Sequence, residues 1–129
     1  MIVEGVPCVA VMTFQGLLVT RPDAGHEGRT VAQFEWITDF ANNIAKPAVS
    51  ENHVLITSAY NHQTPCKLEI TLDGARKIWE QPFPSKVRSA IIHNGHIYIA
   101  WQRMRRLASC GTRQWASILQ RLRRQHGVL

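Results

Sequence analysis

Short runs of alternating or β-branched apolar residues, separated by turn residues, extend along most of the chain. The pattern predicts strands at residues 9–14, 17–20, 30–37, 54–57, 67–72 and 76–79. Residues 21–28 contain two glycines and a proline among charged residues, which predicts an exposed loop. The dipeptide Asp73-Gly74 is a hairpin signal, because a two-residue primed turn requires positive φ at both positions. The pattern therefore predicts an all-β chain.

The predicted strands recur with a fixed period. Trp36 and Trp79 lie 43 residues apart, and the same shift aligns apolar residues and a histidine without a gap. The aligned pairs are Phe40 and Phe83, Ile44 and Val87, Val49 and Ile92, His53 and His96, Val54 and Ile97, and Ile56 and Ile99. A period of about 40 residues with several short strands per unit is typical of a β-propeller blade. A β-sandwich, the alternative, does not explain a tryptophan that recurs at a fixed phase.

The next tryptophan, Trp115, follows Trp79 after only 36 residues. We expect the second copy to lack an equivalent of the loop at residues 61–65, which would account for the shorter spacing. On this alignment Gly111 precedes Trp115 as Gly74 precedes Trp79. The unit is thus expected to end in a glycine turn that leads to the next tryptophan.

The two copies resemble the PQQ-like repeats of the quinoprotein alcohol dehydrogenase-like β-propeller family. The matching stretches are residues 47–49, 52–56, 68–70, 73–79 and 90–98, and the resemblance covers roughly residues 34–107. It also extends to the propeller lipoprotein of outer-membrane assembly, and related propellers are often periplasmic or secreted. In that family the tryptophan of one blade packs beside the glycine turn of the next. The resemblance therefore implies blade-packing roles for Trp36, Trp79, Trp115, Gly74 and Gly111.

The repeat pattern ends after Leu107. Downstream, Trp115, Ile118, Leu119 and Leu122 have the spacing of one helix face, which predicts a short amphipathic helix. We therefore predict a partial N-terminal blade and loop at residues 1–33, two PQQ-like repeats at 34–112, and a basic C-terminal helix or tail at 113–129. Propellers close with typically 4–8 blades, so this chain is expected to form a partial β-propeller of two to three blades of antiparallel strands. One hypothesis is that it resembles a truncated copy of a longer propeller.

The positive charge lies in the second part of the chain. The net charge is +6, yet residues 1–80 hold six Lys/Arg and nine Asp/Glu, whereas residues 81–129 hold nine Lys/Arg and no acidic residue. Nonspecific binding of polyanions, including nucleic acid, is therefore an alternative function. Specific nucleic-acid binding is not expected, because no helix-turn-helix or RNA-binding motif is present. The candidate polyanion contacts are Arg103, Arg105, Arg106, Arg121, Arg123 and Arg124.

Six histidines and three cysteines are potential metal ligands. His62 and Cys66 lie four residues apart, and His93 and His96 lie three apart, spacings that would place each pair on one face of a helix. Here they fall in predicted strands and turns, and His53 and His96 occupy equivalent repeat positions, which favours a role in turns. No metal site is predicted. Three widely spaced cysteines are also too few for a disulfide scaffold.

Catalysis has no motif in this sequence. There is no Gly-x-Ser-x-Gly elbow, phosphate-binding glycine loop or dinucleotide fingerprint. Distant relatives bind pyrroloquinoline quinone and Ca²⁺, so a fragment of a quinone-dependent dehydrogenase is the other alternative. Such a site needs acidic ligands, and no acidic residue follows Glu80. We therefore expect no enzyme activity, no cofactor, and no catalytic or cofactor-binding residues.

The expected function is that of a scaffold or protein-interaction module. An arc of two to three blades leaves exposed edges, which favour binding of a protein partner or self-association. No apolar run approaches the ~20 residues of a membrane helix. The first 14 residues contain Glu4 and no Lys/Arg, so they do not read as a signal peptide.

Overall fold

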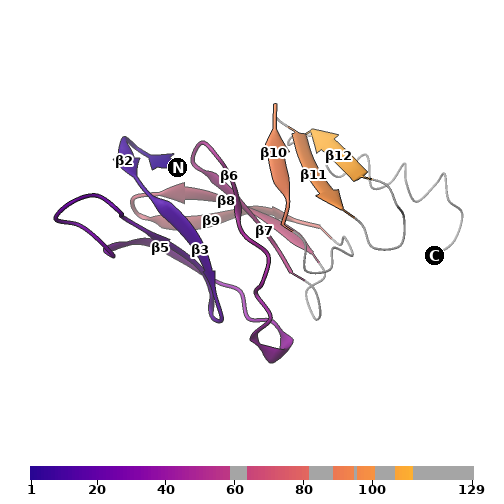
Figure 1. Cartoon of the computed structure of the whole chain (residues 1–129), viewed down its shortest axis with the longest axis horizontal. Coiled ribbons are helices and arrows are strands. Elements are labelled where there is room, and N and C mark those ends of the chain that lie inside the picture. Colours follow the sequence, from indigo (N-terminus) through magenta and orange to yellow (C-terminus); the bar gives the residue numbers. More distant parts are fainter. Residues whose placement is uncertain (59–63, 82–88, 95, 101–106, 112–129) are drawn as a thin grey trace, which may run out of the picture.

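The computed structural model describes residues 1–58, 64–81, 89–94, 96–100 and 107–111, and these fold into β-strands (Figure 1). The all-β prediction is confirmed for this part of the chain, whereas the predicted C-terminal helix lies outside it. One 3-10 helix, η1 (Asp39–Ala41), interrupts the strands. The strands are β1 (Ile2–Val3), β2 (Val6–Pro7), β3 (Val9–Thr13), β4 (Gly16–Thr20), β5 (Thr30–Glu35), β6 (Ala48–Ser50), β7 (His53–Thr57), β8 (Pro65–Thr71), β9 (Gly74–Glu80), β10 (Ile91–His93), β11 (His96–Ala100) and β12 (Leu107–Gly111).

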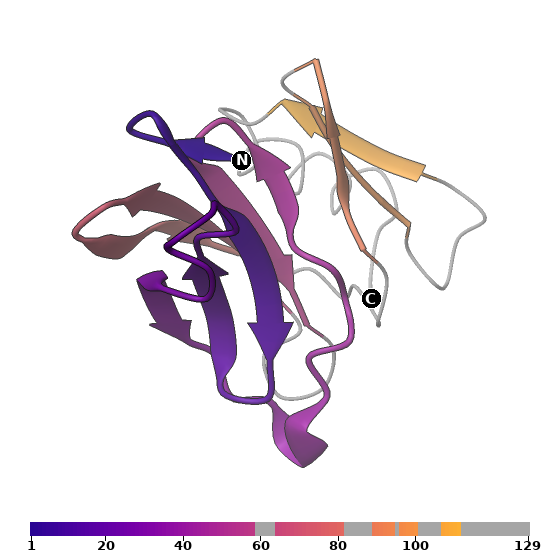
Figure 2. The same cartoon turned by 60° about the vertical axis from the view of Figure 1, so that its left-hand side comes forward.

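The strands form three antiparallel sheets and one small hairpin. The first sheet has the order β3-β4-β5, the second β6-β7-β8-β9 and the third β10-β11-β12, while β1 pairs with β2. The sheets follow one another in chain order (Figures 1 and 2), with β5 against β9 and β6 against β10. Among the described residues no helix is long and apolar enough to cross a membrane.

The hairpin predicted at Asp73-Gly74 is present, but its turn differs from the prediction. Gly74 pairs with Thr71, so the two turn residues are Leu72 and Asp73. Neither has positive φ, so the turn is not a primed one. The positive φ falls instead on Gly74, at +144°. A primed turn does occur at Glu4-Gly5, with φ of 49° and 82°, in the β1–β2 hairpin that the pattern missed because its strands are so short.

The 43-residue period is visible in the strand pairing. Ala48 pairs with Leu55 in the second sheet, and Ile91 pairs with Tyr98 at the equivalent positions of the third. The segments that enter β6 and β10 also meet, because the Lys46 amide donates a hydrogen bond to Ser89 Oγ at 2.9 Å, across a separation of 43 residues. The internal repeat of the sequence is therefore a repeat of backbone pairing.

The connection between the second and third strands of the unit differs from the expectation. Residues 58–64 connect β7 to β8, and residues 101–106 connect β11 to β12. The second copy therefore retains this connection, shortened by one residue. In consequence Gly111 pairs with His96, just as Glu69 pairs with His53 in the second sheet. Gly111 is therefore the equivalent of Glu69 and not of Gly74.

Apolar side chains fill the spaces between successive sheets. The first cluster lies between the first and second sheets, and the second cluster between the second and third. The first cluster consists of Val3, Cys8, Leu17, Val19, Ala32, Trp36, Val54, Ile56, Cys66, Leu68 and Ile70, and the second of Ala48, Leu55, Ala90, Ile97 and Ile99. The second sheet is thus covered on both faces, and the sheets are held together by side-chain burial.

Candidate interaction surface

The two tryptophans within the described residues lie at different junctions between sheets. Trp36 follows β5 and belongs to the first cluster, where it is 3% exposed and its ring centroid lies 6.3 Å from that of Phe34. Trp79 lies in β9, is half-buried and packs against the second cluster. Each tryptophan therefore lies on the face of its own sheet that meets the next sheet along the chain.

The other residues expected to pack blades are placed differently. An added Cβ at Gly74 would meet no atom within 4 Å, so its surroundings are open. Gly111 is the last residue of β12. Trp115 and all six arginines expected to contact polyanions lie outside the described residues.

Gly16 is a packing glycine that the sequence pattern did not single out. An added Cβ at Gly16 would lie 2.2 Å from the Phe34 carbonyl oxygen and 2.5 Å from the Trp36 amide nitrogen. These distances are far below van der Waals contact, so only glycine allows the two strands to approach here. Nearby, the Trp36 amide donates a hydrogen bond to the Gln15 carbonyl at 3.0 Å. A signal existed in the sequence, because Thr13-x-x-Gly16 repeats the Thr71-x-x-Gly74 motif, with each threonine hydroxyl donating to the glycine carbonyl.

Asn43 is a second residue that the pattern missed. Its side-chain amide donates hydrogen bonds to the carbonyls of Thr13, at 2.9 Å, and Trp36, at 2.8 Å. Its Oδ1 accepts a hydrogen bond from the Thr38 hydroxyl at 3.2 Å. Asn43 thereby ties the segment between β5 and β6 to the β3–β4 turn. A single asparagine in a loop carries no periodic signal from which this role could be read.

The outermost faces of the stack carry exposed apolar side chains. On the first sheet, Val9 and Val11 project away from the second sheet, beside half-buried Leu18. Val11 is 42% exposed, whereas Val54 and Ile97, which follow it at steps of 43 residues, are 0% and 1% exposed. The same position is therefore buried in the second and third sheets and open in the first.

The third sheet shows the converse pattern on its far face. Ile91 is 65% exposed, although Ala48, its equivalent in the second sheet, is 7% exposed. Tyr98, which pairs with Ile91, is half-buried, whereas its equivalent Leu55 lies in the second cluster. Apolar positions that pack between sheets inside the stack are thus repeated at both of its ends.

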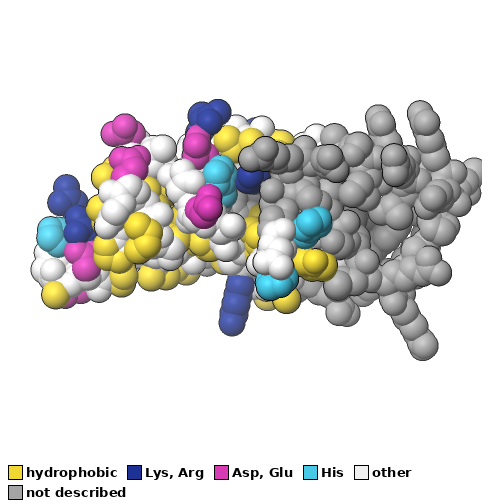
Figure 3. All heavy atoms as spheres, turned by 90° about the horizontal axis from the view of Figure 1, so that it is seen from above, with side chains coloured by type: hydrophobic (Ala, Val, Ile, Leu, Met, Phe, Trp, Pro, Cys, Tyr) yellow, Lys and Arg dark blue, Asp and Glu magenta, His cyan; other side chains and the backbone are white. Residues whose placement is uncertain are grey.

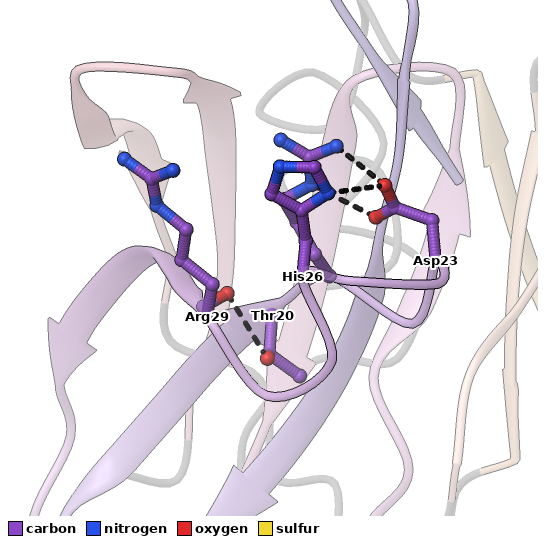
Figure 4. A network of polar contacts seen from close by, with 5 residues as sticks. Thr20, Asp23, His26 and Arg29 are labelled. Carbon is purple, nitrogen blue, oxygen red and sulfur yellow. Dashed lines mark hydrogen bonds and ion pairs between the residues drawn. The ribbon is translucent and has the colours of Figure 1, made fainter.

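A polar cluster closes the loop between β4 and β5 (Figure 4). Arg21 donates to both Asp23 carboxylate oxygens, at 2.8 and 2.5 Å, and His26 Nδ1 lies 3.2 Å from Asp23 Oδ2. The Thr20 hydroxyl donates to the Arg29 carbonyl at 3.1 Å. The hydrogen bond from Arg21 holds the pKa of Asp23 at about 2, below its ordinary value of 3.8. These contacts order the loop.

Charges of both signs lie on the surface of the described part. Figure 3 views the molecule from above and shows acidic, basic and histidine side chains interspersed with apolar ones over that part. Among the described residues, ion pairs join Arg21 to Asp23, Arg76 to Glu69 and Lys77 to Glu80. The described part therefore presents a surface of mixed charge.

Histidine, cysteine and acidic side chains are the groups of this chain that could bind a metal ion or attack a substrate. In the part of the chain that the structure describes, no group of three His, Cys, Asp or Glu residues is placed to hold a metal ion. Cys8 and Cys66 are free and buried, and burial raises the pKa of both thiols, that of Cys66 to about 12. A thiol with such a pKa is protonated and unreactive at neutral pH.

Comparison of the chain with protein-family models, with characterised proteins and with solved structures finds no match.

Proposed function

We propose that this chain is a propeller-type repeat protein of two to three blades, without catalytic activity, that acts as a scaffold or protein-interaction module. Three observations support the proposal. The strand pairing repeats every 43 residues, as Ala48 with Leu55 and Ile91 with Tyr98. Successive sheets stack through apolar clusters, and Trp36 and Trp79 each lie between their own sheet and the next.

The exposure of Val11 carries the interaction part of the proposal. At its equivalent positions the chain buries Val54 and Ile97 beneath a neighbouring sheet, but it supplies no such cover for Val11 among the described residues. Contiguous apolar surface left open on a soluble protein marks a site of association. The open face of the first sheet, formed by Val9, Val11 and Leu18, is therefore the proposed binding surface.

The test is a charge placed on this face. Val11→Lys puts a cation at the centre of the open face, and Ala24→Lys adds the same charge on the exposed β4–β5 loop as a matched control. We expect the wild-type chain to associate in light scattering and to bind an apolar dye. Val11→Lys should reduce both signals severalfold, because a partner would have to desolvate the ammonium group. Ala24→Lys should change neither signal. A monomeric wild-type chain whose dye binding is unaffected by Val11→Lys would overturn the proposal.

A further inference from the structure

The first sheet lacks the inner strand that the other two sheets possess. This inner strand is β6 in the second sheet and β10 in the third. Each has three residues and pairs with the strand that follows it, β7 or β11. Counting back 43 residues from β6 gives residues 5–7, which include β2. Yet β2 pairs with β1, so β3 is left as an edge strand of the first sheet. In the described part of the chain, no strand occupies the place beside β3.

Turn chemistry explains why β2 does not fold back on β3. The turns after β6 and β10 begin with Glu51 and Asn94, whose φ angles are 53° and 48°. The equivalent residue is Cys8, which has no positive φ and is followed by the β-branched Val9. Because Cys8 does not adopt the left-handed conformation of Glu51 and Asn94, no tight turn forms here and the chain continues directly into β3. The Glu4-Gly5 turn instead directs β2 onto β1, and Met1 and Cys8 extend that pairing by two further hydrogen bonds.

The open edge of β3 presents a defined set of backbone groups. Thr13 and Gly16 flank a two-residue turn, so the alternation of an antiparallel ladder directs Val11 and Val9 toward β4. The amide and carbonyl groups of Ala10 and Met12 then point to the open edge. Their equivalents, His53 and Leu55, are the residues of β7 that face Ser50 and Ala48 of β6. The edge therefore offers the same donors and acceptors that bind an inner strand elsewhere in the chain.

We propose that the edge of β3 binds an extended segment of a partner polypeptide, which adds as an antiparallel strand in the place that β6 and β10 occupy in their sheets. The inner strands themselves indicate the chemistry of this segment. Both carry two consecutive apolar residues, the second of them β-branched, followed by a polar residue: Ala48-Val49-Ser50 and Ile91-Ile92-His93. The β-branched residue of the partner lies opposite Val11, as Val49 lies opposite Val54, and packs beside its exposed side chain. This inference rests on the proposed interaction function and names the partner for which the first sheet is suited.

A peptide of this chain is the probe. Residues 88–94, which contain β10, are titrated as a synthetic peptide against the full isotope-labelled chain, and the amide resonances are followed by NMR. We expect saturable shifts at Ala10 and Met12. N-methylation of Ile91 removes an N–H that pairs with β11 in the parent sheet, whereas N-methylation of Ile92 modifies an N–H that points away from it. The first change should weaken binding about fivefold and the second less than twofold, since one hydrogen bond is at stake.

A change in the chain supplies the reciprocal test. Ala10→Pro deletes an outward-pointing donor without removing a bond to β4, and proline is tolerated on edge strands. This variant should retain the folded spectrum and bind the peptide at least fivefold more weakly. Equal binding of the two N-methylated peptides, or shifts confined to the third sheet, would overturn the inference. If no peptide binds at millimolar concentration while Val11→Lys still abolishes association, the edge inference fails and the proposed function stands. If the peptide binds at β3 and the chain shows no association that depends on Val11, the proposed function fails.

Discussion

Replacement of Gly16 by alanine is expected to be far more destabilising than the same change at Gly74. Both glycines end a Thr-x-x-Gly turn, and both have φ in the positive region, at 137° and 144°. Alanine at either position incurs backbone strain of about 1–3 kcal/mol, because φ near 140° is a conformation that L-residues rarely adopt. The change in the entropy of the unfolded chain is the same for both variants. The difference between them therefore isolates the packing around each glycine.

The packing differs sharply between the two sites. At Gly16 the new methyl group would lie 2.2 Å from the Phe34 oxygen and 2.5 Å from the Trp36 nitrogen, whereas at Gly74 it meets nothing within 4 Å. Relief requires β4 and β5 to separate by about 1 Å, which would break the Trp36–Gln15 hydrogen bond and a neighbouring ladder bond, at about 0.5–1.5 kcal/mol each. We expect a total loss of about 2–6 kcal/mol in unfolding free energy for Gly16→Ala and about 1–3 kcal/mol for Gly74→Ala.

Urea unfolding followed by tryptophan fluorescence measures both variants, because Trp36 is buried beside Gly16. Midpoints are compared at a common m-value, so that a change in compactness is not mistaken for a change in stability. Equal losses at the two glycines would refute the reasoning, since strain alone would then explain both. A Gly16→Ala variant that is more stable than Gly74→Ala would contradict the close approach of β4 and β5 itself.

Three further predictions concern the core, a thiol and an ion pair. Leu68→Ala should cost about 2–5 kcal/mol of unfolding free energy, because Leu68 is fully buried in the first cluster. Leu72→Ala, at an exposed turn, should cost well under 1 kcal/mol, and chemical denaturation of the two variants measures the difference. In a Cys110→Ser background, the buried Cys66 should resist a thiol reagent at pH 8 until urea unfolds the chain, since its pKa is about 12. Because Cys8 is also present, the labelled residue is identified by peptide mass spectrometry, and rapid labelling of Cys66 in the folded protein would contradict its burial. Asp23, with a folded pKa of about 2 against 3.8, contributes stability that is fully present above about pH 4 and is lost as the pH falls toward 2. Asp23→Asn should therefore show a flatter melting temperature over that interval, and an unchanged slope would argue against the Arg21–Asp23 pair.

The strands that a local apolar pattern defines could be predicted from the sequence. Short apolar runs predicted β3, β4, β7 and β8 to within a few residues, because strands with buried faces are rich in β-branched and other apolar residues, whether they alternate or not. The 43-residue period could also be found in the sequence, since equivalent strands pack against equivalent neighbours and keep apolar residues at the same positions. Turn geometry was less accessible. Asp73-Gly74 identified its hairpin but not the turn residues, because pairing of Thr71 with Gly74 moves the turn one residue toward the N-terminus.

The spacing of the tryptophans was not sufficient to show which residues of the second copy are equivalent to those of the first. The shorter interval between Trp79 and Trp115 suggested a deleted loop, whereas the β11–β12 connection is only one residue shorter than its counterpart. Register across strands determines which residues are equivalent, and register depends on pairing between segments that are distant in sequence. Gly111 consequently takes the position of Glu69, opposite His96.

The short antiparallel strands of the described residues, the repeat of their units and the concentration of positive charge after residue 80 could all be predicted from the sequence, because each of these properties is local or additive along the chain. Which repeated positions are covered depends on the packing of one sheet against another, which no local pattern encodes. Val11, Val54 and Ile97 are equivalent as apolar β-branched residues, yet just one of them is exposed, because burial depends on whether the preceding sheet packs against that face, and among the described residues no sheet precedes the first. The same holds for Gly16 and Gly74, whose turns match in sequence and differ in what lies beside them.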